Sequence, residues 1–320
     1  MPDSAANEEP AENQDPSDFR AVGARLSNWG RWGDDDQLGT VNLITPAHRA
    51  AAAGLVRRGD VFDLGMPLDS NGPQRGGSRF NPIHRMTAIP TDGARPDGML
   101  VTDDIVLMPL QCATQWDGLA HVGYDGLLYN RVPASAVTAS RGVERNSFHH
   151  LAALLVGRGV LLDIAGLRGV ACLDPGEEIT PDDLDAALER QGVQVGSGDI
   201  VLVRTGWYRH FAAGDSATYM GPATPGLGLF CCEWLRERDV AAVASDNYIV
   251  EVLPSRQPPA LYPLHMVAIR DMGMTLGEMF NLEQLAADCR ADGVWSFLLV
   301  GTGLKVTGST GTPLTPVAIK

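Results

Sequence analysis

Features that mark several large protein classes are missing from this chain of 320 residues. The amino terminus has no basic segment followed by an apolar one, and no apolar run approaches the roughly 20 residues that span a bilayer. We therefore expect neither a signal peptide nor a membrane segment. The five cysteines are odd in number and include no Cys-x-x-Cys pair, which argues against a disulfide framework and a zinc ribbon. Together these absences predict a cytoplasmic protein.

Positive charge is also scarce. Lys and Arg number 25 against 39 Asp and Glu, a net charge of −14, whereas binding of DNA or RNA needs clustered positive charge. The chain has neither a Gly-x-x-x-x-Gly-Lys-[Ser/Thr] nor a Gly-x-Ser-x-Gly pattern, which argues against P-loop and serine-hydrolase chemistry. The expected ligand is a small molecule, with no nucleic acid and no membrane as partner.

The composition that is present, 44% hydrophobic and 20% charged, is typical of a globular protein. Residues 1–17 predict a disordered acidic tail, and residues 18–320 are expected to form one domain. Strand and helix signals interleave, which predicts an α/β fold with a mixed sheet. Residues 70–100 lack periodicity and predict a long irregular excursion, such as a lid or a subunit contact. Strands are expected at 61–66, 103–110, 159–164, 199–204, 239–244 and 295–300, and helices at 46–55, 182–191 and 282–290.

A cluster of polar side chains follows the apolar run 105–110, which predicts a buried strand leading into Gln-Cys-Ala-Thr-Gln-Trp-Asp-Gly-Leu-Ala-His at 111–121. Gln111, Gln115 and Asp117 share the parity that points side chains to one side of a strand, and His121 can return toward them after a turn. Buried groups of this kind need a ligand or each other, and an Asp beside a neutral His suits a cation or a general base. Alternatively, Asp117 and His121 simply pair to brace the turn.

A second pair of candidate residues lies later in the chain. His265 follows a proline-rich stretch, and Glu278 lies just ahead of the helix expected at 282–290. Backbone N–H groups at a helix start stabilise a nearby negative charge. A hydrogen-bonded core histidine and an exposed acid are the alternatives, because two residues thirteen positions apart make no signature by themselves.

Residues 111–121 resemble the signature His-x-Gly-Thr-His-x-Asp-x-Pro-x-His of the metal-dependent cyclase-like hydrolase family, which includes bacterial kynurenine formamidases and isatin hydrolases. The resemblance covers most of the chain from about residue 19. It implies a swivelling β/β/α domain with a mixed sheet, usually assembled as a homodimer or homotetramer with loops contributed across the interface. The further segments that carry it are Asn28-Trp-Gly-Arg-Trp-Gly, Leu38-Gly-Thr-Val-Asn-Leu, His121-Val-Gly-Tyr-Asp-Gly, Val201-Leu-Val-Arg-Thr-Gly-Trp and Asp271-Met-Gly-Met.

In that family the signature His, His and Asp bind one or two divalent ions, a later His and Glu add ligands, and the final His transfers protons. Here Asp117 and His121 match by position and His265 and Glu278 match by order, so the resemblance implies a metal site that includes them and Gln115. Gln111 and Gln115 replace the two signature histidines, Ala113 replaces the glycine and Leu119 the proline. Amide oxygens are hard and weak donors compared with imidazole. The implied ion is manganese or zinc, or else magnesium. A site that binds no metal remains an alternative.

We hypothesise a hydrolase that acts on an amide, lactam or related carbonyl bond of a small aromatic metabolite. His121 would act as general base and then acid beside Asp117. Two alternatives remain: a metal-free cyclase, lyase or dehydratase of secondary metabolism that uses Asp117 and His121, and an inactive binding or scaffold protein. Substrate contacts are predicted for four residues, of which the two aromatic ones are equally plausible as core residues: Gln111, Gln115, Trp116 and Tyr124.

Overall fold

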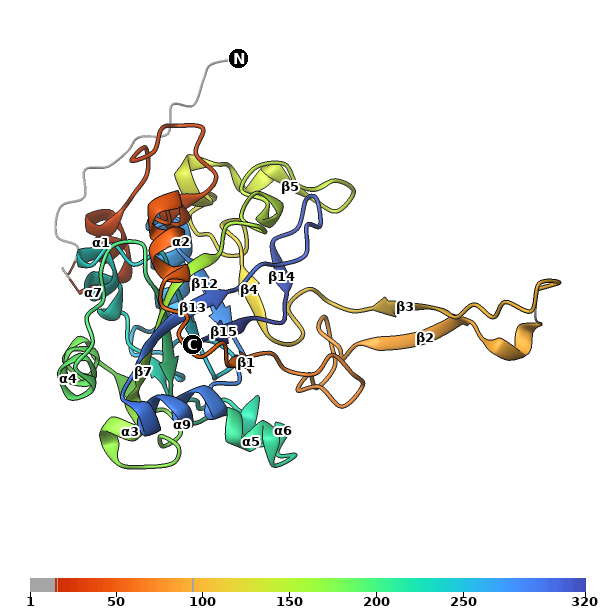
Figure 1. Cartoon of the computed structure of the whole chain (residues 1–320). Helices are drawn as coiled ribbons and strands as arrows, with labels where there is room; N and C mark the ends of the chain where they lie inside the picture. The colour runs from red at the N-terminus through yellow and green to blue at the C-terminus, as the bar shows by residue number, and fades with distance from the viewer. Residues whose placement is uncertain (1–14, 16, 94) are drawn as a thin grey trace, which may run out of the picture.

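The computed structural model describes residue 15, residues 17–93 and residues 95–320. Nearly all of the predicted acidic tail lies outside the described residues. Directly after it, α1 (Phe19–Leu26) begins where the Asp18 carboxylate accepts a hydrogen bond from the Arg20 N–H. Figure 1 shows a body built around one large sheet, from which a two-stranded arm projects. A single domain over 18–320 stays a prediction.

Nine strands of the described region form the large sheet, in the order β1-β15-β13-β7-β9-β11-β12-β4-β14. The four strands β7, β9, β11 and β12 run parallel, and the flanking strands pair antiparallel. The predicted α/β class with a mixed sheet is confirmed. The strands are β1 (Val61–Asp63), β4 (Gln115–Asp117), β7 (Val156–Asp163), β9 (Ile200–Arg204), β11 (Ala242–Ser245), β12 (Thr275–Glu278), β13 (Ser296–Val300), β14 (Gly311–Pro313) and β15 (Val317–Ile319).

The central parallel strands are buried on both faces, as continuous apolar runs in such strands require. In β7, Val160 and Leu162 point into one hydrophobic core, while Leu161 points into the other. α4 (Pro181–Gln191) and α7 (Cys231–Glu237) pack on the first core, and α9 (Glu283–Asp292) packs on the second. The helix predicted at 182–191 is confirmed.

Shorter elements complete the body. They are α2 (Pro46–Ala53), α3 (Ile164–Arg168), α5 (Tyr208–Ala212), α6 (Ser216–Tyr219), α8 (Pro263–His265), the π-helical turn η6 (Met266–Asp271), β5 (Val137–Thr138), β6 (Gly142–Val143), β8 (Glu178–Ile179) and β10 (Gly226–Leu227). No helix in the part of the chain that the structure describes is long and apolar enough to cross a membrane.

The projecting arm corrects one prediction. The strand expected at 103–110 forms, as β3 (Asp103–Leu107), but it is not buried. Among the described residues it pairs only with β2 (Ile83–Ala88), and all its residues are exposed. Ile105 and Leu107 leave 57% and 61% of their surface uncovered. An apolar run is typical of buried strands, but the sequence does not say whether the covering surface belongs to the same chain.

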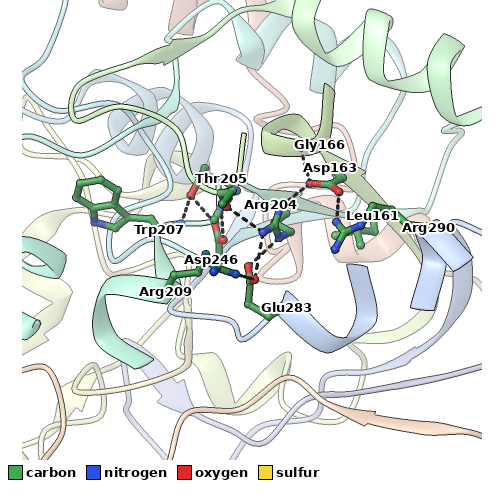
Figure 2. A network of polar contacts seen from close by, with 12 residues as sticks. Leu161, Asp163, Gly166, Arg204, Thr205, Trp207, Arg209, Asp246, Glu283 and Arg290 are labelled. Atoms are coloured by element: carbon green, nitrogen blue, oxygen red, sulfur yellow. Dashed lines mark hydrogen bonds and ion pairs between the residues drawn. The ribbon is translucent and has the colours of Figure 1, made fainter. Parts of the chain in front are cut away.

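A buried ion network holds the carboxyl ends of β7 and β9 against α9 (Figure 2). The Arg204 guanidinium, 3% exposed, lies 2.8 Å from Asp163 Oδ1 and 2.8 Å from Glu283 Oε1. At the end of β11, Asp246 accepts hydrogen bonds from the Thr205 N–H at 2.8 Å and the Thr205 hydroxyl at 2.6 Å. These contacts fix the sheet edge at which β12 also ends.

We predict that Arg204→Ala lowers the free energy of unfolding by about 3 kcal/mol, because Asp163 and Glu283 lose their buried cation and keep only the more exposed Arg290 and Arg209. Arg209 contacts the same Glu283 carboxylate, but its side chain is 53% exposed. The control Arg209→Ala should therefore lose at most about 1 kcal/mol. Urea unfolding measures both variants, and equal losses would contradict this account of the network.

Candidate metal and catalytic centre

The candidate site lies where β12 ends beside the antiparallel strand β4. In the register of this pair, Glu278 is opposite Gln115 and Leu276 is opposite Asp117. Opposed residues point to the same face, and residues two apart on one strand share a face. Gln115, Asp117 and Glu278 therefore come together at the carboxyl end of the parallel strands, the edge where ligands bind in open α/β sheets.

His265 enters this cluster from α8, immediately before the π-helical turn η6. Its Nε2 atom lies 3.2 Å from Glu278 Oε1 and 3.9 Å from Asp117 Oδ2. Its Nδ1 atom lies 2.5 Å from Glu251 Oε1, and Glu251 also accepts the backbone N–H groups of Leu264 and His265. Glu251 thus fixes the imidazole plane and turns Nε2 toward the two carboxylates.

His121 connects the cluster to solvent. A turn closed by a hydrogen bond from the His121 N–H to the Gly118 carbonyl brings the ring back, so that Nε2 lies 3.7 Å from Asp117 Oδ1. The side chain of His121 is 19% exposed, whereas Asp117 and Glu278 are almost completely buried. A ligand that approaches from solvent therefore meets His121 before it meets the acids.

Burial dominates the electrostatics of the cluster. It raises the pKa of Glu278 to about 7, and the nearby Asp117 charge adds to this rise. Burial alone would lower the pKa of His265, but its hydrogen bonds with Glu251 and Glu278 outweigh that and raise the pKa to about 10. Two carboxylates so close together and so little solvated favour an added positive charge between them.

The Gln115 side chain bridges both carboxylates. Its Nε2 atom donates to Asp117 Oδ1 at 3.0 Å and to Glu278 Oε2 at 2.8 Å, while its own Oε1 has no partner. Gln115 was expected to be a metal ligand, but the structure points its amide nitrogen at the acids. To bind an ion through oxygen, the amide would have to turn over.

The remaining donors fit a divalent ion. One ligand atom from each of Asp117, His265 and Glu278 lies within 4.8 Å of the others. Asp117 Oδ2 is buried and has no hydrogen-bond partner, which is the state of an oxygen that faces a cation. Two carboxylates and one imidazole suit manganese or zinc.

Three predicted substrate contacts lie elsewhere. The Gln111 amide donates to the Thr310 hydroxyl at 3.2 Å and makes no contact with the cluster. Trp116 is fully buried in the core, because it points to the opposite face of β4 from its two neighbours. The Tyr124 hydroxyl donates to Asp271 Oδ2 at 2.7 Å and lines a separate cavity of about 330 Å³. The structure corrects the placement of Trp116, which is a core residue, whereas substrate contacts by Gln111 and Tyr124 stay predictions.

Two residues at the site were missed by the sequence predictions. Glu251 orients His265, and Arg79 Nη2 lies 3.5 Å from His121 Nε2. No motif surrounds Glu251. Arg79 falls in the stretch 70–100, where the absence of periodicity gave no way to place a side chain.

Comparison with known proteins decides the family. A model of the family described as putative cyclase matches residues 62–252, more than half of the chain. The chain belongs to the putative cyclase family. A crystal structure of a novel cyclase covers 92% of this chain and 100% of its own, with a TM-score of 0.85 and 38% identity.

Two isatin hydrolases are similar to this cyclase-family chain. That of Roseibium aggregatum is 28% identical over 144 residues, which are 43% of this chain and 51% of that protein. The chain thus matches about half the length of this curated relative. Isatin hydrolase A from Labrenzia aggregata, bound to benzyl benzoate, covers 83% of this chain and 94% of its own, with a TM-score of 0.61 and 21% identity. The latter likeness shows the fold alone.

We predict that Gln115→Met lowers the free energy of unfolding of metal-free protein by about 2–4 kcal/mol, because both carboxylates lose a charged hydrogen bond. The matched control Gln111→Met removes only the contact with Thr310 and should lose at most about 1.5 kcal/mol. Urea unfolding in the presence of a chelator compares them. Equal losses would show that the amide does not bridge the acids.

Proposed function

We propose that this member of the putative cyclase family is a hydrolase of C–N bonds other than peptide bonds, acting on a small aromatic amide or lactam in the manner of an arylformamidase. The observation that carries the proposal is the convergence of Asp117, His265 and Glu278 beneath a single, partly exposed His121. The likeness to isatin hydrolases supports a cyclic or aromatic amide as substrate class.

Each residue has a role in this proposal. Asp117, His265 and Glu278 would hold a divalent ion. Such an ion lowers the pKa of a bound water and polarises a carbonyl. His121 takes a proton from the attacking water as the new C–O bond forms, and delivers it to the nitrogen as the C–N bond breaks. Glu251 keeps His265 oriented throughout.

One observation favours a second candidate, a metal-free cyclase, lyase or dehydratase. The Gln115 amide already donates a hydrogen bond to each carboxylate, which is a task that a cation would otherwise perform. In that case Asp117 and His121 carry out the acid–base chemistry unaided. The two candidates differ in whether activity survives removal of metal.

We predict that protein loaded with manganese or zinc hydrolyses N-formylkynurenine or isatin. Asp117→Asn and His121→Gln should each lower kcat/KM by about 100-fold or more, because each removes an acid–base or ligand group. Gln111→Ala, outside the cluster, is the control. Chelation should abolish turnover, and added metal should restore it.

Two results would contradict the proposed hydrolase. Normal turnover of a confirmed substrate by both variants would show that the site is wrongly assigned. Turnover that persists in metal-free protein but is lost in His121→Gln would favour the second candidate.

We also propose that the arm docks on a second copy of the chain, giving a homodimer or homotetramer. A two-stranded hairpin is at best marginally stable alone in water, and an exposed apolar strand is a site of association. Ile105, Val106 and Leu107 are each more than half exposed on β3. A second copy supplies the surface that this part of the chain lacks.

We predict that Ile105→Lys combined with Leu107→Lys shifts the protein from an oligomer to a monomer in sedimentation experiments, because charge prevents the arm from being covered. Val294→Lys, at an exposed apolar position of the body, is the control and should leave the oligomer intact. An oligomer unchanged by the double substitution would place the subunit contact elsewhere.

We propose the cytoplasm as the place of action. All five cysteines are free thiols, four of them completely buried, which suits a reducing compartment.

A further inference from the structure

The loop that leads into the arm presents one cation to the site. In the loop 74–81, Gly76 and Gly77 adopt φ of +100° and +91°, and Gly76 bridges Arg79 across a tight turn. Positive φ suits glycine because other residues are strained there. The turn therefore has a defined shape, with Arg79 at its closing position.

Side-chain hydrogen bonds hold this turn in place. The Asn81 side chain spans the loop: its Oδ1 accepts the Gln74 N–H at 2.8 Å, and its Nδ2 donates to the Gln74 carbonyl at 3.1 Å. The Gln74 side chain donates to the Cys112 carbonyl at 3.0 Å, which ties the loop to the segment before β4. Arg79 is thereby fixed relative to Asp117 and His121.

Arg79 faces the cluster of His121, Asp117 and Glu278. Its Nη2 atom lies 3.5 Å from His121 Nε2, and the same nitrogen of His121 lies 3.7 Å from Asp117 Oδ1. Among residues 15, 17–93 and 95–320, no carboxylate lies within ion-pair distance of this half-buried guanidinium. A half-buried cation without a counterion favours an anion from outside the chain.

We propose that Arg79 determines specificity by binding a carboxylate carried by the substrate itself. A guanidinium offers a planar fork of N–H donors that matches a carboxylate with two parallel hydrogen bonds. A single arginine beside two acids suits one carboxylate better than a phosphate dianion, which needs more positive charge. The inference rests on the proposed function, since the same site must hold the reacting bond.

The geometry narrows the substrate class further. Because Arg79 touches His121, the carboxylate and the reacting carbonyl must be separated by only a few bonds. An aryl amide with a carboxylate on the adjacent ring carbon meets this condition. N-formylkynurenine, whose carboxylate is distant from the formamide, and isatin, which has none, do not meet it, so both should turn over more slowly than such an amide. When a divalent ion neutralises the negative charges of Asp117 and Glu278, the charge of Arg79 makes the entrance of the site positive. A positive entrance attracts such an anion.

Two ring compounds of equal shape test the inference without turnover: anthranilate, which carries a carboxylate, and 2-aminobenzamide, its neutral counterpart. Calorimetric titration of the full-length, metal-loaded protein should show anthranilate binding at least about tenfold more tightly, as expected for a charged hydrogen-bonded pair. Arg79→Gln should abolish this preference while leaving 2-aminobenzamide affinity unchanged, which also shows that the variant is folded. Arg79→Lys should retain part of it.

Arg75 provides the matched control, because it is an exposed arginine four residues earlier on the same loop. Arg75→Gln should keep the full preference. The inference is overturned if the parent shows no preference, if Arg79→Gln keeps it, or if Arg75→Gln loses it equally. A preference that survives Arg79→Gln but disappears on chelation would assign the carboxylate to the ion instead.

This test is independent of the proposed hydrolysis. If Arg79 controls the preference but no amide or lactam is turned over, the proposed function fails and the anion site stands. If turnover occurs and the preference does not depend on Arg79, only the inference fails.

Discussion

Two buried carboxylates, Asp117 and Glu278, are brought side by side by the antiparallel pairing of β4 with β12. Neither is solvated, so their mutual repulsion must be offset by neighbouring groups. The Gln115 amide and the His265 imidazole each contribute to this, and the unpartnered oxygen of Asp117 leaves room for a cation. The chemistry proposed for the site follows from how that charge is balanced.

The fold places these groups through long-range pairing rather than through one motif. The parallel strands end together, and the Arg204 network fixes the neighbouring part of the same edge. Glu251 holds His265 from behind, and the loop that carries Arg79 reaches the front beside His121. The buried acids thus lie at the back of the site and the partly exposed His121 and Arg79 at its entrance, an arrangement suited to a small ligand that arrives from solvent.

Local patterns in the sequence predicted part of this site. The shared parity of Gln115 and Asp117 and the turn before His121 follow from strand geometry, and that same parity should have excluded Trp116 from the substrate wall. His265 and Glu278 stand out in the sequence only as a weak pair of candidates, and the family resemblance adds their metal-binding role, because the π-helical turn η6 and most of β12 separate them along the chain. Three features could not be predicted from the sequence: the orientation of the Gln115 amide, the exposure of β3 and the position of Arg79. They depend on contacts between distant segments or between chains, which a pattern in one sequence does not show.

Anomalous X-ray diffraction from crystals soaked in manganese tests the central claim most directly. The account predicts a peak between Asp117 Oδ2, Glu278 and His265 Nε2, at coordination distance from all three. Crystals that diffract well and show no peak there, or a peak held by other residues, would contradict the claim that the two buried acids form a metal centre.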